Sequence, residues 1–180
     1  MKNITRFFSS LLLTLFFGFY GHAQLDLGDL AIVGYNSDIS PDEIAFVALA
    51  KIPVGQTIYI SDYGWTGSAF STSSTTNGAI TWTITTEVPA GTLLNVMIST
   101  GPTISGDLST YGTVSGTGWT GSAAAVPVAS GGDSWLIYQG ASPTAVPTNW
   151  VFGFANWSTS SGTTAGEWRT SGSATTTTSY

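Results

Sequence analysis

The sequence of 180 residues contains no cysteine, a single histidine, His22, and only four Lys or Arg residues. Without cysteine the chain can form neither disulfides nor a thiolate nucleophile. A single imidazole also removes most routes to histidine-based catalysis and zinc binding. Because a serine nucleophile needs a neighbouring base, these absences argue against most enzyme classes. We therefore expect no catalytic residue in this protein.

Long apolar runs are missing beyond the first 23 residues. Lys2 and Arg6 precede an apolar run over residues 7–20, and small residues follow it at Gly21 and Ala23. A short run of this kind, between basic residues and a small-residue cleavage site, is typical of a secretory signal peptide. We predict a leader over residues 1–23 and a secreted or cell-surface product without membrane insertion after the leader is removed.

Positive charge is scarce as well. Of the four basic residues, two lie in the predicted leader, so two remain against ten acidic residues, a formal charge of −8. Nucleic acids and anionic membrane surfaces both need Lys and Arg for binding. The sequence therefore predicts no nucleic-acid partner, and the acidic charge is typical of a soluble exported protein.

Alternating apolar and polar residues bounded by turn residues dominate the rest of the chain. Ile80, Trp82 and Ile84 alternate with threonines, which indicates a strand with one core face and one wet face. With this one at residues 79–85, seven strands are predicted; the other six are at residues 30–35, 44–50, 57–61, 93–99, 134–139 and 150–155. Short strands at this spacing indicate an all-β sandwich or barrel over residues 24–157. Residues 158–180 are read as a Ser/Thr-rich tail or the truncated start of further sequence.

Three short motifs punctuate these strands. Pro-x-Gly occurs at residues 53–55 and 89–91, each before a strand, which suits a type I turn. Asn77-Gly78 predicts a tight turn. The hexapeptide Gly-Trp-Thr-Gly-Ser-Ala occurs twice, at residues 64–69 and 118–123. We interpret it as a recurring loop whose tryptophan covers a sheet edge.

The order of motifs resembles a known type of module. The segments that carry the resemblance are residues 28–36, 46–49, 52–65, 78–82, 89–92 and 132–140. Together they look like a module of secreted bacterial surface proteins and are similar to lamin-tail-type domains, which are immunoglobulin-like antiparallel β-sandwiches. The resemblance spans residues 28–155 and implies that fold, together with a non-catalytic role, often as one part of a larger extracellular protein.

Acidic and amide side chains gather near the start of this region. Asp29, Asn36, Asp38 and Asp42 fall close together in the sequence, and Ca²⁺ prefers oxygen ligands of this kind. They form a candidate calcium site, although their spacing does not match an EF-hand loop. The alternative is a solvated acidic loop, which is the usual role of a charge run.

Seven tryptophans are many for this length. Trp82 and Trp135 alternate with core-type neighbours and are expected in the core. Trp65, Trp119 and Trp157 lie among Gly, Ser and Thr, and aromatic faces in loops can stack on sugar rings. They are the candidate ligand-binding residues, with a polysaccharide or another surface protein as the partner, while packing over a sheet edge is the alternative for each.

These observations favour a non-catalytic secreted or cell-surface module with a structural or adhesive binding role. A carbohydrate-binding module of a larger protein is the first alternative. A carboxylate- or metal-dependent hydrolase is the second, since paired carboxylates cleave glycosidic bonds. The isolated carboxylates are Asp62, Glu87, Asp107, Asp133 and Glu167, and no two of them form a recognisable pair.

Overall fold

The computed structural model describes residues 24–36, 41–99, 103–120 and 132–157. The predicted leader and the predicted tail lie outside these ranges. Within them, no helix is both long and apolar enough to cross a bilayer.

Eleven strands and one short helix make up the described chain. They are β1 (Leu30–Asn36), β2 (Asp42–Ala48), β3 (Thr57–Ser61), β4 (Gly64–Trp65), β5 (Phe70–Ser71), β6 (Gly78–Ile84), β7 (Leu93–Ser99), β8 (Thr103–Gly106), α2 (Leu108–Tyr111), β9 (Gly112–Gly118), β10 (Gly132–Gln139) and β11 (Asn149–Trp157). All pairs of neighbouring strands are antiparallel.

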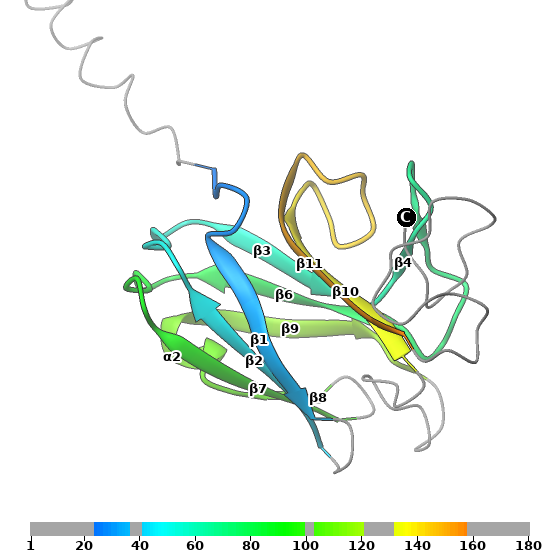
Figure 1. The fold of residues 1–180 in the computed structure, drawn as a ribbon, viewed down its shortest axis with the longest axis horizontal. Coiled ribbons are helices and arrows are strands. Elements are labelled where there is room, and N and C mark those ends of the chain that lie inside the picture. The colour runs from blue at the N-terminus through cyan, green and yellow to red at the C-terminus, as the bar shows by residue number, and fades with distance from the viewer. Residues whose placement is uncertain (1–23, 37–40, 100–102, 121–131, 158–180) are drawn as a thin grey trace, which may run out of the picture.

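The strands form two layers, which confirms the expected antiparallel β-sandwich (Figure 1). One sheet has the order β1-β2-β7-β8 and the other has the order β11-β10-β3-β6-β9. Strands β4 and β5 form a separate two-stranded arm beside the ends of β10 and β11. The chain passes from one sheet to the other between β2 and β3, between β6 and β7, and between β8 and β9. Such connections between two sheets are typical of immunoglobulin-like sandwiches.

Side chains from both sheets fill the space between the layers. Ile44 and Phe46 from β2 meet Ile58, Ile80 and Trp82 from the larger sheet, and all five are at most 1% exposed. This pattern follows from strand geometry, since alternate residues point to opposite faces of a sheet. Trp82 and Trp135 are buried in this core, as predicted.

The two Pro-x-Gly segments lie against each other. Ile52 and Val88, each just before its proline, exchange two backbone hydrogen bonds of 2.9 and 3.0 Å. Gly55 and Gly91 have φ of 90° and 82°, a conformation that glycine adopts without steric cost. The paired turns therefore close one end of the sandwich.

The predicted tight turn at Asn77-Gly78 is wrong. A two-residue hairpin turn of this type needs a positive φ at both residues, and Asn77 has none. Gly78 instead begins β6, and the Asn77 side chain donates a 2.7 Å hydrogen bond to the carbonyl oxygen of Asp62. Asn77 and Gly78 therefore do not form a chain reversal, and Asn77 instead fixes the segment that contains Asp62.

Candidate functional site

Six hydroxyl side chains lie in rows across the outer surface of the five-stranded sheet. Strand register aligns Thr57 with Thr83 and Thr83 with Thr113. It also aligns Thr81 with Ser115 and places Thr117 opposite Ala79. The hydroxyl oxygens of Thr57 and Thr83 are 3.4 Å apart, which shows that these side chains share a face. We call this set the hydroxyl face; its members are Thr57, Thr81, Thr83, Thr113, Ser115 and Thr117.

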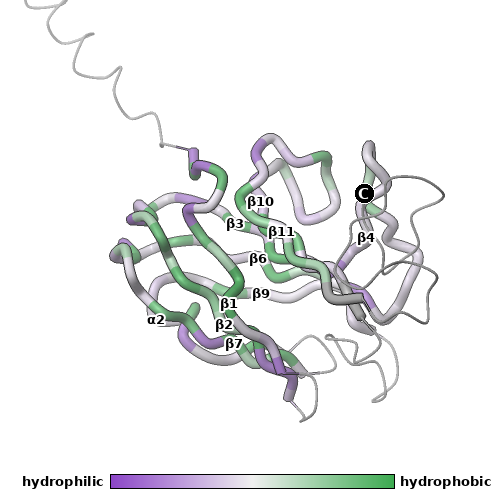
Figure 2. Tube along the Cα trace, viewed as in Figure 1, coloured by the Kyte–Doolittle hydropathy of each residue, from purple (hydrophilic) through white to green (hydrophobic). Residues whose placement is uncertain are grey.

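The hydroxyl face forms because the residues between its members point inward. Ile80, Trp82 and Ile84 in β6 are buried in the core, so the intervening threonines must face outward. The three members in β9 are exposed, and the three in β3 and β6 are half-buried. Figure 2 shows β9 in pale tones, in contrast to the hydrophobic colour along β10. Strands β3, β6 and β9 contain no Asp, Glu, Lys, Arg or His, so this surface has no formal charge.

An aromatic cluster borders the hydroxyl face on the side of β10 and β11. Phe70 from the arm stacks on Tyr138 of β10, with ring centroids 4.9 Å apart. Trp65 packs edge-on against Phe70 at 4.9 Å and against Trp150 of β11 at 5.2 Å. Tyr59 of β3 completes the cluster at 5.6 Å from Tyr138. These rings hold the arm against the outer surface of the sheet.

Asp62 joins the base of the arm to the second copy of the hexapeptide. Its carboxylate accepts a 2.9 Å hydrogen bond from the indole Nε1 of Trp119 and a 2.5 Å hydrogen bond from the backbone N–H of Gly78. Burial raises the pKa of the Asp62 carboxyl from 3.8 to about 8, although these hydrogen bonds act to lower it. Both oxygens of the Asp62 carboxyl group are hydrogen-bonded, and the side chain is 1% exposed. This group therefore has a structural role, which is to hold Trp119 and Gly78 next to the base of the arm.

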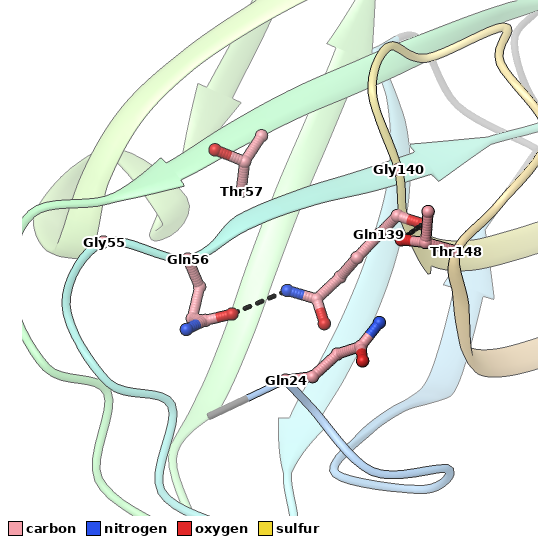
Figure 3. Close-up of a pocket in the computed structure, with 7 residues that line it drawn as sticks. All are labelled: Gln24, Gly55, Gln56, Thr57, Gln139, Gly140 and Thr148. Carbon is pink, nitrogen blue, oxygen red and sulfur yellow. Dashed lines mark hydrogen bonds between the residues drawn. The ribbon is translucent and has the colours of Figure 1, made fainter. Parts of the chain in front are cut away.

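A cleft of about 360 Å³ opens at the other end of β3. Figure 3 shows two glutamine side chains, Gln56 and Gln139, pointing toward each other across it. The Nε2 of Gln139 donates a 2.6 Å hydrogen bond to the Oε1 of Gln56. The Oε1 of Gln139 accepts hydrogen bonds from the backbone N–H of Leu25 at 2.9 Å and from the Nδ2 of Asn149 at 3.3 Å. This amide cleft was not predicted, because no local motif marks two glutamines 83 positions apart.

Two of the candidate ligand-binding tryptophans, Trp65 and Trp119, are buried, although the sequence indicated exposed loops. Trp119 is 0% exposed and lies 6.2 Å from Trp135 in the core. Trp65 is 9% exposed within the aromatic cluster. Neither ring offers an open face, so the expectation that they face solvent is wrong and packing over a sheet edge describes them better. Trp157 ends β11, and its side chain lies outside the described part of the structure.

The candidate calcium ligands do not all come together. Asp29 lies just before β1 and accepts a 2.7 Å hydrogen bond from the backbone N–H of Asp26. Asn36 ends the same strand, about 20 Å away at roughly 3.3 Å per residue. Asn36 pairs with Glu43, and Asp42 is the residue next to Glu43 in β2. The Asp42 side chain is buried and points to the opposite face of the sheet from Glu43 and Asn36, so strand pairing does not bring Asn36 and Asp42 together. Asp38 lies outside the described residues, and calcium binding stays a prediction.

The carboxylates considered for hydrolysis are dispersed. Glu87 forms a surface ion pair with Lys51 at 3.3 Å. Asp107 accepts a 2.8 Å hydrogen bond from the backbone N–H of Asn95, beside helix α2. The described residues contain no group of three His, Cys, Asp or Glu side chains arranged to hold a metal ion. Glu167 and the side chain of Asp133 lie outside the described part of the chain.

Thr57 belongs to the first row of the hydroxyl face and also lines the cleft. Its hydroxyl faces Thr83 on the outer surface, whereas the side chain of the preceding residue, Gln56, points away from it (Figure 3). Because alternate residues point to opposite faces of a sheet, the hydroxyl face and the glutamine pair lie on opposite sides of β3. Comparison of the chain with protein-family models, with curated proteins and with solved structures found no match.

Proposed function

We propose that this protein is a secreted or cell-surface, non-catalytic binding module whose hydroxyl face contacts a neutral polysaccharide. The observation that carries the proposal is the alignment of hydroxyl side chains in rows across β3, β6 and β9. The leader-like N-terminal sequence and the resemblance to a module of secreted bacterial surface proteins support an extracellular setting.

The chemistry of the hydroxyl face suits a sugar surface. Each Thr or Ser hydroxyl both donates and accepts hydrogen bonds, as sugar hydroxyls do. Neighbouring strands lie about 4.8 Å apart and alternate residues of one strand about 6.7 Å apart. The rows thus present a regular grid that an extended polymer can contact at several points. Since the grid has no charge, a neutral glycan fits it better than an anionic one.

Another surface protein is the competing partner. Protein interfaces usually have an apolar or aromatic centre surrounded by a polar rim. The hydroxyl face has the opposite arrangement, because its centre is polar and its aromatic residues lie in the bordering cluster, where Phe70 and Tyr138 are buried. This arrangement favours the polysaccharide.

The proposal can be tested by measuring retention of the purified protein on insoluble polysaccharides. Cellulose, chitin and a β-1,3-glucan serve as neutral supports, and alginate serves as an anionic comparison. We expect retention on at least one neutral support, with little effect of salt, because screening weakens ion pairs and not neutral hydrogen bonds. Thr113→Glu and Thr117→Glu should each lower the affinity by about tenfold or more, a loss of about 1.4 kcal/mol.

The matched control is Thr103→Glu, which adds the same charge at an exposed position in β8 of the other sheet. It should bind like the unmodified protein. Retention on no neutral support, or an equal loss in the control variant, would show that the hydroxyl face is not the contact surface.

A further inference from the structure

The edges of the two main sheets are the strands β1, β8, β9 and β11, and three of them have features that hinder pairing with a further strand. Strands β1 and β11 each contain an extra residue that shifts the register, Val33 and Val151, and β8 has only four residues. Bulges and short strands are common ways in which proteins protect sheet edges. Strand β9 has seven residues, pairs with β6 without a register shift, and contains neither proline nor a charged residue. Among the described edge strands, β9 is therefore the one best suited to accept another strand.

The free backbone groups of β9 belong to alternate residues. The backbone N–H and C=O of Ile84 in β6 bond to the segment just before β3, at 2.8 and 2.9 Å. Successive residues of a strand direct their hydrogen bonds to opposite sides, so Thr83 bonds toward β9, where it is aligned with Thr113. The backbone groups of Val114 and Gly116 consequently point away from β6. On that side β9, the outermost strand of the larger sheet, has no neighbour among the described strands (Figure 1).

The sequence of β9, Gly-Thr-Val-Ser-Gly-Thr-Gly, reads nearly the same in both directions. In an antiparallel pair of two β9 strands centred on Ser115, this residue lies opposite its own copy and Thr113 lies opposite Thr117. The same register places Val114 opposite Gly116, and these are the residues whose backbone groups are free to form a hydrogen-bonded pair. The sequence and the direction of the free backbone groups thus agree on one register. Neither strand carries a charge that would oppose it.

The inner side of β9 offers little obstruction to a second strand. Its inward positions are Gly112, Val114, Gly116 and Gly118, so three of the four have no side chain. Helix α2 packs on this inner side, because the carbonyl oxygen of Leu108 accepts a 3.0 Å hydrogen bond from the indole of Trp82, a core residue. The helix therefore lies between the layers and not beside β9 in the plane of the sheet.

We infer that two copies of this protein associate through their β9 strands, which pair antiparallel about Ser115 and join the two larger sheets into one. A two-fold axis perpendicular to the sheet relates the copies, so both hydroxyl faces lie on the same side. The row through Thr81 and Ser115 continues into the same row of the second copy. The association does not depend on polysaccharide binding, because backbone groups form the contact. One pair of short strands is a small interface, so the dimer is weak and forms at high protein concentration.

The experiment is sedimentation of the purified protein in low-salt buffer at concentrations up to about 1 mM, where association worth about 4 kcal/mol becomes visible. We expect the average mass to rise toward that of a dimer. Ser115→Lys and Ser115→Glu each place like charges opposite one another across the axis. Each should raise the dissociation constant by about tenfold or more, equivalent to about 1.4 kcal/mol. An equal mixture of the two variants places opposite charges across the axis and should restore the dimer, which also shows that both variants are folded.

The matched controls are Thr103→Lys and Thr103→Glu, at an exposed position of β8 in the other sheet. They should associate like the unmodified protein. A monomer at every concentration would overturn the inference and leave the β9 edge to a strand of a different molecule. Equal association of the Ser115 variants, or a mixture that does not associate, would place the contact elsewhere and overturn it too. Because no polysaccharide is present, each of these results is independent of whether the protein is retained on the insoluble supports.

Discussion

At the scale of single residues, Asp62 is the most constrained ionisable group among those described. Its carboxylate is buried and bonded to Gly78 and Trp119. Gly78 itself has no room for a side chain, because an added Cβ would lie 2.5 Å from the Trp119 ring. The backbone N–H of Trp119 also donates a 2.9 Å hydrogen bond to the carbonyl oxygen of Asn77. These contacts explain why Trp119 lies in the core although its sequence neighbours are typical of an exposed loop.

The stability of the protein should depend on pH through Asp62. In the unfolded chain this carboxyl has its ordinary pKa of 3.8, and in the folded protein burial raises the pKa to about 8. Between about pH 4 and pH 8 the unfolded state therefore releases a proton that the folded state retains, so the free energy of unfolding falls as pH rises. Above about pH 8 the Asp62 carboxyl is ionised in both states, so it no longer makes the free energy of unfolding depend on pH.

Denaturant unfolding at a series of pH values measures this dependence. The Asp62→Asn variant should be less stable at low pH, because its amide cannot accept hydrogen bonds at both positions. Its stability should also vary less with pH across the same window. A variant with the pH profile of the unmodified protein would assign the dependence to other groups.

At the scale of elements, the sequence predicts the strands that alternate apolar and polar residues. Segments 57–61 and 93–99 match β3 and β7 in full, and residues 79–85 match β6 within one position. Strands β8 and β9 were missed, because Gly, Ser and Thr dominate them and no apolar alternation is present. Strand β9 is ordered by its pairing with β6, a long-range contact that local sequence cannot reveal.

The same limit applies to the candidate site. The sequence alone shows Thr81 and Thr83 on the polar face of one strand. Two threonines are too few to indicate a binding surface. Their neighbours Thr57, Thr113 and Ser115 join them only through strand register. Thr85, which the sequence grouped with them, lies beyond the end of β6, and its backbone N–H bonds to the carbonyl oxygen of Tyr111.

The β4–β5 arm should unfold locally when its aromatic contacts are removed. Phe70 is 8% exposed and contacts Trp65, Tyr138 and Trp150. We expect Phe70→Ala to raise amide hydrogen exchange in residues 64–71 by about tenfold or more, equivalent to about 1.4 kcal/mol, while exchange in β3 and β6 stays slow. Ser68→Ala, at an exposed position of the same arm, is the control and should leave exchange unchanged. Uniform acceleration across both sheets would mean that the arm is not a separate unit.

At the scale of the whole molecule, residues 24–29, which precede β1, connect the two sheets at one edge. The backbone N–H of Gly28 donates a 2.7 Å hydrogen bond to the carbonyl oxygen of Val151 in β11. Leu25 is 3% exposed and belongs to the core, and its backbone N–H bonds to Gln139 at the end of β10. Residues just before β1 thus contact the larger sheet, while β1 itself belongs to the smaller one.

Two leucines in this segment allow a matched test. Leu25→Ala removes a core side chain and should lower the free energy of unfolding by about 2–5 kcal/mol. Leu27 is 79% exposed, so Leu27→Ala should change the free energy of unfolding by about 0.5 kcal/mol or less. Thermal and denaturant unfolding of both variants measure the difference. Equal stabilities would show that the segment does not contribute to the core.

The burial of the tryptophans decides what an optical probe of this protein reports. Among the described indole side chains, those of Trp65, Trp82, Trp119 and Trp135 are shielded from water, and that of Trp150 is partly open. Emission from these buried indoles should therefore lie at short wavelength in the native state and shift to the red as the sandwich opens. Of the five described indoles, only that of Trp150 is open enough for an added sugar to quench its emission.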